Sequence, residues 1–299
     1  MKILLLLCCL LLAHTVARAQ VQAPWVLPDI NSPRVKRVLF DSAAAKQQVS
    51  CYVFTPEPYD RSTDQRFPVL YWLHGSGGSS AQAVMSHTRR YAAAMREGKM
   101  PLMIIVFPNG LPNGMWCDWK DGSIKLETIV LKELIPHIDR TYRTVAAREG
   151  RIIEGFSMGG YGSARLALAH PDMFCAASPM GAGPMQPEFT ETPRASPRMR
   201  ERLFRSVYGG DMDCYRALSP WKLAEVNAAN LRSGLLLRQI VGEKDETMPN
   251  NRAFHQHLEQ LKIPHTYREL PGIPHNPDQV LDALGEDNWK FYVEALRKK

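Results

Sequence analysis

Features typical of membrane, metal-binding and nucleotide-binding proteins are missing from this 299-residue sequence. No segment approaches the ~18 consecutive apolar residues that a transmembrane helix needs, so no membrane span is expected. The cysteines have no metal-ligand spacing, and no metal site or cofactor is therefore expected. A Gly-Lys-Ser/Thr phosphate-binding sequence is also absent.

Clustered positive charge is also scarce. Lysine and arginine number 37 against 30 acidic residues, which gives a formal net charge of +7. Because these basic residues are scattered singly or in pairs, a nucleic-acid partner is not expected. The densest basic segment covers residues 194–205, where arginine alternates with proline, methionine and glutamate.

The composition is that of an ordinary globular protein. The hydrophobic fraction of 45% is too high for a disordered chain, and no Gly-X-Y period suggests collagen. The length fits one large α/β domain or two smaller ones. No repeat, linker or shift in composition divides the chain, so a single domain is expected.

The N-terminus has the layout of a secretory signal peptide. A positive charge at Lys2 precedes an apolar run over residues 3–12, and small residues follow at Ala17 and Ala19. A lipoprotein anchor on the cysteines within the apolar run is a weaker alternative. We expect a signal peptide over residues 1–19, cleavage before Gln20, and a secreted or periplasmic mature protein covering residues 20–299.

Four cysteines remain after this cleavage. Export would place them in an oxidising compartment, where disulfides are permitted. Four cysteines allow three complete pairings, and the sequence does not choose among them. The four are Cys51, Cys117, Cys175 and Cys214.

Strand-like and helix-like segments alternate along the rest of the chain. Continuous apolar strands that alternate with helices indicate a mostly parallel sheet covered by helices on both faces, the α/β class. The first two strands, 35–40 and 49–54, are expected to form an antiparallel pair. The further predicted strands are 68–74, 103–107, 151–153, 235–241 and 265–270, and the predicted helices are 81–97, 124–140, 158–169, 219–230, 250–262 and 279–297.

Residues 181–220 interrupt this alternation. The segment contains four prolines in its first half and is too long for a plain connection. A lid or substrate-side insertion and a disordered surface loop are both open at this point.

A Gly-x-Ser-x-Gly motif, Gly155 to Gly159, lies between a predicted strand and a predicted helix. This spacing is typical of a nucleophile placed on a sharp strand-to-helix turn, where neighbouring side chains would clash. Ser157 is the predicted nucleophile. An idle serine in a glycine-rich connection is the alternative.

A nucleophilic serine needs a base and an orienting acid, which follow it along the chain in this type of fold. His275 lies in a proline-rich loop after the last predicted strand and is the predicted base. The other histidines after the serine are less suitable because a helix end, a helix surface or the wrong end of a strand carries them. These are His170, His255, His257 and His265.

The predicted acid is Asp245, three residues after the glycine that ends a core strand. Glu243 is the main rival, and Asp211, Asp213 and Asp278 are weaker candidates. The same cluster of carboxylates could also be a charged surface loop.

The oxyanion formed by attack on a carbonyl needs two N–H donors. Met158 follows the nucleophile directly and is expected to supply one. The small-residue loop after the 68–74 strand is expected to supply the other from Ser76, with Gly77 as the next candidate.

Several of these motifs resemble the esterase-D-type family of α/β-hydrolases. The resemblance rests on His74-Gly-Ser-Gly-Gly78, Gly155-Phe-Ser-Met-Gly-Gly160, Ser219-Pro-Trp221, Gly242-x-x-Asp245 with Asn251-x-x-Phe254, and Pro271-Gly-Ile-Pro-His275. That family includes feruloyl and acetyl-xylan esterases, S-formylglutathione hydrolases and mycolyltransferases. The resemblance implies an α/β-hydrolase fold, the catalytic roles given above, and a substrate-binding role for Trp116 and Asp118. A structural aromatic turn is the alternative for the segment that holds these two residues. This sequence departs from the family where Asn276 replaces the aromatic residue often found after the histidine, which concerns substrate specificity.

The sequence therefore predicts a serine esterase that hydrolyses carboxylic esters through an acyl-enzyme. The expected substrate is a small-molecule or polysaccharide ester, and export favours esters of plant polysaccharides or other extracellular polymers. The resemblance suggests feruloyl or acetyl groups. An acyltransferase that uses a sugar or lipid alcohol with the same triad is one alternative. A non-catalytic binding protein on the same scaffold is the other.

Overall fold

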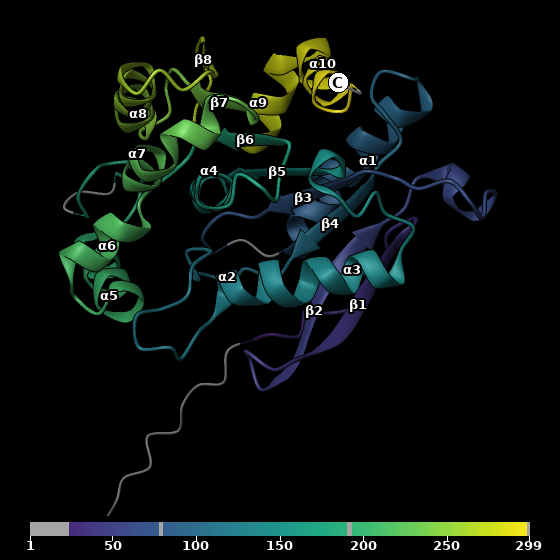
Figure 1. The fold of residues 1–299 in the computed structure, drawn as a ribbon, viewed down its shortest axis with the longest axis horizontal. Helices are drawn as coiled ribbons and strands as arrows, with labels where there is room; N and C mark the ends of the chain where they lie inside the picture. The colour runs from purple at the N-terminus through teal and green to yellow at the C-terminus, as the bar shows by residue number, and fades with distance from the viewer. Residues whose placement is uncertain (1–23, 78–79, 190–192, 298–299) are drawn as a thin grey trace, which may run out of the picture.

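The computed structural model describes residues 24–77, 80–189 and 193–297. The predicted signal peptide lies outside these residues. Eight strands form one sheet in the order β1-β2-β4-β3-β5-β6-β7-β8, with helices on both sides (Figure 1). β1 pairs antiparallel with β2, and β2 pairs antiparallel with β4, whereas all the other pairs are parallel. The expected α/β fold and its opening antiparallel pair are confirmed.

Each predicted strand is present, and the structure adds one more. The strands are β1 Val35–Ser42, β2 Gln47–Phe54, β3 Val69–Leu73, β4 Ile104–Pro108, β5 Arg151–Phe156, β6 Ala176–Met180, β7 Leu236–Gly242 and β8 Thr266–Leu270. The sequence prediction missed β6, which reads Ala-Ala-Ser-Pro-Met and has no β-branched or aromatic residue. This strand forms because β5 and β7 pair with it on either side and bury all five residues.

The helices are α1 Ser80–Arg96, α2 Leu126–Thr128, α3 Ile135–Thr141, α4 Met158–Ala169, α5 Pro197–Tyr208, α6 Met212–Leu218, α7 Pro220–Leu231, α8 Met248–Gln260, α9 Pro277–Leu284 and α10 Glu286–Ala295. A wide helical turn, η2 Ile129–Leu134, joins α2 to α3, and single turns η1 Glu57–Asp60 and η3 Arg148–Gly150 complete the described elements. The single helix predicted over 279–297 is two helices. Gly285 separates them with a φ of 49°, a conformation that glycine adopts without strain.

Successive side chains of the strands point to opposite faces of the sheet and contribute to two separate hydrophobic cores. In β3, Val69 and Tyr71 pack with the helices from α2 to α8, whereas Leu70 and Trp72 pack with α1, α9 and α10. The helical segment from α2 to α3 crosses in front of β1 and β2, and α5 and α6 form a pair at one side of the molecule (Figure 1). The carboxyl ends of the parallel strands are left free to carry functional loops.

A buried ionic network anchors β5, the strand that leads to Ser157. Glu154 is fully buried and accepts hydrogen bonds from the hydroxyls of Tyr91 (2.5 Å) and Tyr292 (2.7 Å). Arg238 on β7 lies 3.3 Å from Glu154 and donates to Ser178 on β6 at 3.0 Å. A buried charge needs such a partner and hydrogen bonds. The network therefore ties β5, β6 and β7 to the helices α1 and α10.

The four described cysteines are all unpaired. Three are buried, and burial raises the pKa of the Cys51 thiol to about 12. None of the three pairings left open by the sequence is present among the described residues. Within the same residues, no helix is both long enough and apolar enough to cross a bilayer.

Candidate active site

Ser157 occupies a sharp turn between β5 and α4. Its backbone has φ 61° and ψ −120°, an unfavourable conformation for a residue with a side chain. The N–H of Ser157 donates to the Met180 carbonyl at 3.0 Å, and its carbonyl accepts from Gly183 at 3.2 Å. These bonds to the chain after β6 hold the strained turn in place.

The glycines of the motif are required by close backbone approach. A Cβ on Gly155 would lie 2.4 Å from the carbonyl oxygen of Gly159, and a Cβ on Gly159 would lie 1.9 Å from that of Leu73. Both distances are too short for any side chain. The turn thus packs directly against the end of β3, as the Gly-x-Ser-x-Gly spacing predicts.

Asp245 and His275 are hydrogen-bonded to each other. His275 Nδ1 lies 2.7 Å from Asp245 Oδ2, and both side chains are buried. The other carboxylate oxygen accepts from the backbone N–H (2.8 Å) and the hydroxyl (2.7 Å) of Thr247. Burial of Asp245 opposes ionisation, but the bonds from His275 and Thr247 outweigh it and hold the pKa of the carboxyl below its usual value. An ionised Asp245 fixes the His275 proton on Nδ1 and leaves Nε2 free to accept one.

Ser157 and His275 line the same cavity, and the His275 ring also packs 4.5 Å from that of Phe156, the residue before the serine. The proline-rich loop after β8 carries His275 to the carboxyl edge of the sheet. Asn276 then caps α9 by accepting from the N–H groups of Asp278 and Gln279. The structure therefore gathers the three residues that the sequence predicts as a triad.

The rival carboxylates and histidines have other partners. Exposed Glu243 accepts from Gly272, Asp211 caps α6, and Asp213 pairs with Arg216. Asp278, on α9, lines the cavity and lies 3.7 Å from His87. Of the remaining histidines, His170 binds Glu127, His255 and His265 bind each other, and His257 lies near the Trp221 carbonyl.

Of the two predicted oxyanion donors, Met158 directly follows Ser157, and Ser76 lines the same cavity. Met158 begins α4, so its N–H belongs to the electropositive N-terminus of that helix. A Cβ on Gly75 would lie 3.1 Å from the Ser157 Cβ, which shows how closely the loop after β3 approaches. The Gly77 N–H already donates a hydrogen bond to the Pro112 carbonyl at 2.8 Å, so it is not free to bind an oxyanion. The neighbouring Ser76 lines the cavity, and this geometry favours it over Gly77 as the second donor.

The cavity has a volume of about 550 Å³ and walls of different character. Residues of the predicted insertion form an apolar wall that includes Met185, Phe189, Met199 and Leu203. The insertion is thus largely ordered, with α5 and α6 in its second half, although residues 190–192 lie outside the described residues. Besides Ser157 and His275, the polar residues of the lining are His74, Ser76, Ser86, His87, Asn113, Gln186, Arg194, Thr247, Asn250 and Asp278.

Comparison with known proteins agrees with this geometry. Residues 42–298 match the model of a family described as "Putative esterase". This chain belongs to that esterase family. The resemblance inferred from the sequence motifs is therefore confirmed.

Two curated relatives and one solved structure illustrate the similarity. An endo-1,4-beta-xylanase/feruloyl esterase of Xylanibacter ruminicola is 30% identical over 184 residues, which is 56% of this chain and 24% of that protein. An esterase of Mycobacterium tuberculosis is 26% identical over 81% of this chain and 56% of its own length. The chain thus spans between a quarter and just over half of these relatives. The structure of a ferulic acid esterase superposes with a TM-score of 0.73 at 24% identity, covering 88% of this chain and 98% of the other.

The structure gives Trp116 and Asp118 contacts within the fold, in place of the substrate-binding role that the resemblance implies. Trp116 is fully buried and packs against Gly110 and Gly162, where any residue larger than glycine would clash with the indole ring. The indole N–H donates to the His74 carbonyl at 3.3 Å. Asp118 accepts from the backbone N–H and the hydroxyl of Thr128 at 3.0 and 2.5 Å. Neither lines the cavity among the described residues. Asn113 and Met115 of the same loop do so instead.

His74 is a positioning residue that the sequence analysis did not assign. Its Nδ1–H donates to the Gly75 carbonyl at 2.9 Å, and its Nε2 accepts from the Gly110 N–H at 3.0 Å. Burial lowers the pKa of His74 to about 4, so the ring is neutral and keeps this tautomer. His74 thereby links the loops after β3 and β4, which border the cavity. Its place at the end of a strand, directly before the glycines, was the available signal.

A second buried pair fixes α4, the helix that follows the nucleophile. Arg165 donates to the Trp116 carbonyl at 3.0 Å and to Glu127 at 2.5 Å, and His170 lies 2.6 Å from the other oxygen of Glu127. Burial of Glu127 opposes ionisation, but its partners His170 and Arg165 lower the pKa of the carboxyl to about 2. The pair therefore holds α4 against the loop that contains Trp116.

This shift predicts a specific loss of stability in acid. The folded-state pKa of Glu127 is depressed, so its contribution is present above the unfolded value near 4.5 and is lost as the pH falls towards about 2. The loss should amount to about 2–3 kcal/mol of unfolding free energy. The Glu127→Gln variant is expected to be less stable than the wild type at neutral pH. Its unfolding free energy should also fall less than that of the wild type between these pH values. Urea unfolding of both proteins across this pH range measures the change in unfolding free energy.

Glu149→Gln is the matched control, because the Glu149 side chain is exposed and forms no ion pair or hydrogen bond with the described residues. It should keep the wild-type pH dependence. Equal slopes for Glu127→Gln and wild type would show that the Glu127 pair does not stabilise the fold in this way.

Proposed function

We propose that this protein is a secreted serine esterase that cleaves carboxylic esters carried by extracellular polysaccharides. The observation that carries the proposal is the 2.7 Å bond between Asp245 and His275 in a cavity that also exposes the strained Ser157. Family membership supports ester hydrolysis, and the relatives named for feruloyl ester cleavage support a feruloyl or acetyl substrate. Secretion rests on the N-terminal sequence.

In the proposed mechanism, Ser157 Oγ attacks the ester carbonyl while His275 Nε2 takes its proton. The negative charge on the carbonyl oxygen is stabilised by the N–H groups of Met158 and Ser76. Asp245 holds the imidazole and stabilises its protonated form. The protonated His275 then gives its proton to the leaving alcohol, and an acyl group remains on Ser157.

Water completes the proposed cycle. His275 removes a proton from a water molecule that attacks the acyl-enzyme, and the carboxylic acid leaves as the Ser157 hydroxyl is restored. The chemistry uses only side chains and backbone groups of this chain. The apolar wall of Met185, Phe189, Met199 and Leu203 suits an aromatic or aliphatic acyl group.

We expect the purified protein to hydrolyse methyl ferulate or acetylated xylan as well as a short p-nitrophenyl ester. Chromatography of the products, with and without an added sugar or glycerol acceptor, tests this expectation. Free acid as the main product supports the esterase, whereas an acyl-acceptor product would favour the acyltransferase alternative. If none of these esters is cleaved, the polysaccharide esterase proposal is wrong.

A further inference from the structure

The basic segment found in the sequence forms a row of arginines beside the cavity. Residues 194–205 hold five arginines and one glutamate, a net charge of +4 in a chain whose total is +7. Four of them lie on α5, which lies next to α6 at one side of the molecule (Figure 1). Arg198, Arg202 and Arg205 are exposed and follow the i, i+4, i+7 spacing, so they share one face of the helix.

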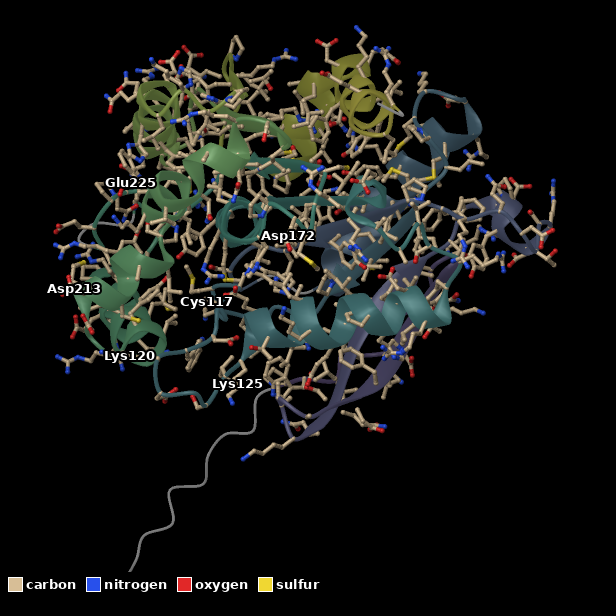
Figure 2. The ribbon with its side chains drawn as sticks, in the orientation of Figure 1. Cys117, Lys120, Lys125, Asp172, Asp213 and Glu225 are labelled. Atoms are coloured by element: carbon tan, nitrogen blue, oxygen red, sulfur yellow. The ribbon has the colours of Figure 1, made fainter. Side chains whose placement is uncertain are left out.

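Much of this positive charge has no counterpart. Arg198, Arg200 and Arg202 make no side-chain ion pair or hydrogen bond with the described residues. Nearby acids already have bases of their own. Lys120 pairs with Asp211, and Figure 2 shows Lys120 and Asp213 together at the outer edge beside α5 and α6. The other pairs are Arg216 with Glu188 and Asp213, Arg205 with Glu201, and Arg194 with Glu246.

The helix that carries the row also forms part of the wall of the cavity that contains Ser157. α5 contributes Met199 and Leu203 to the lining, and Arg194, just before the helix, lines it as well. A ligand held by the exposed face of α5 would therefore lie along the helix whose neighbouring face, with Met199 and Leu203, lines this cavity. Like charges at i, i+4 oppose helix formation, so the row destabilises α5 unless an anion is bound.

The geometry points to a polyanionic glycan, with repeated carboxylates, as the polymer that docks on this row and presents its esters to Ser157. The presentation of esters rests on the proposed function, whereas docking itself does not. Guanidinium groups bind carboxylates in a paired, planar geometry, and a row of them suits a polymer with repeated acidic units.

A membrane is less suitable than a soluble polymer. An amphipathic helix that lies on a bilayer needs a free apolar face. On α5 that face is covered, because Leu203, Val207 and Tyr208 are buried and Phe204 stacks on Phe189 with ring centroids 5.7 Å apart. What remains for a partner is the charged face alone.

Binding of unesterified polygalacturonate to the full protein tests the docking directly. We expect Arg198→Glu/Arg202→Glu to weaken binding by about tenfold or more at low salt. Raising the ionic strength from about 20 mM to about 500 mM, which shortens the Debye length to about 4 Å, should weaken wild-type binding in the same way. The matched control, Lys132→Glu/Arg140→Glu, makes the same charge change at exposed positions of η2 and α3, which do not line the cavity. It should bind like the wild type.

A kinetic comparison tests the presentation of esters. The measured quantity is the ratio of kcat/KM for acetylated polygalacturonate to kcat/KM for neutral acetylated xylan. In Arg198→Glu/Arg202→Glu this ratio should fall about tenfold or more because KM for the acidic polymer rises. The control variant should keep the wild-type ratio. Thermal melting of both variants checks that they fold.

The outcomes separate the two proposals. Arginine-dependent binding without hydrolysis of any ester would reject the proposed esterase function and leave the docking in place. Hydrolysis of esters without arginine-dependent binding would overturn the docking. Binding to phosphatidylglycerol vesicles or duplex DNA, but not to polygalacturonate, would overturn it in favour of a membrane or a nucleic acid.

Discussion

Replacing Ser157 by alanine is expected to lower kcat for a short p-nitrophenyl ester by a factor of about 10⁴–10⁶. Without the hydroxyl there is no atom to carry the acyl group, and only binding and the oxyanion donors remain. The backbone strain at φ 61° is the same for serine and alanine, so the fold should be retained. Initial rates with matched enzyme concentrations, together with the melting temperature, measure both effects.

Ser163→Ala is the matched control for this prediction. Ser163 lies on α4, the helix that follows Ser157, is fully buried, and donates its hydroxyl to the Gly160 carbonyl at 3.0 Å. Its loss should cost about 1 kcal/mol of stability and leave kcat within about twofold. A Ser157→Ala protein that keeps a tenth of the activity would contradict the assignment of the nucleophile.

Changing Asp245 to asparagine is expected to lower kcat by about 10⁴, although the shape of the side chain is preserved. The amide of asparagine can donate to His275 Nδ1, which would place the ring proton on Nε2. In that tautomer His275 cannot accept the proton from Ser157. The 2.7 Å contact between Asp245 and His275 is thus expected to act through the position of one proton.

Glu243→Gln makes the equivalent change at the main rival carboxylate. Glu243 is exposed, and its oxygen accepts from the Gly272 N–H at 2.8 Å, a bond that glutamine can also make. We expect kcat within about twofold of wild type. A large loss in Glu243→Gln combined with a small one in Asp245→Asn would reverse the assignment of the acid.

The residues brought together at the strand ends were the most predictable part of the site. Ser157 and Asp245 each follow a strand that the sequence reveals by its apolar residues, and His275 follows the strand-like Thr-Tyr-Arg-Glu-Leu. The chemistry requires the three residues in this order. Local glycines added a further constraint, since Gly159 can only be glycine where it meets the Leu73 carbonyl. Their catalytic roles stay predictions until the variants are measured.

Features that depend on packing between distant segments were not predictable. Trp116 resembles a pocket residue in the sequence, but its contacts with Gly110 and Gly162 come from two other parts of the chain. The bond between Glu154 on β5 and Arg238 on β7 likewise depends on strand order. The interpretation of 181–220 as a lid stays a prediction, although residues of that segment line the cavity.

Labelling with an active-site phosphonate tests the central claim most directly, because the reagent reacts with an activated serine whatever the natural substrate is. The account predicts the mass increase of one phosphonyl group per molecule, located by peptide mass spectrometry on Ser157, with loss of esterase activity in the same proportion. Ser157→Ala should take up no label. Absence of labelling in the wild type, or a label on another residue with full loss of activity, would contradict the account.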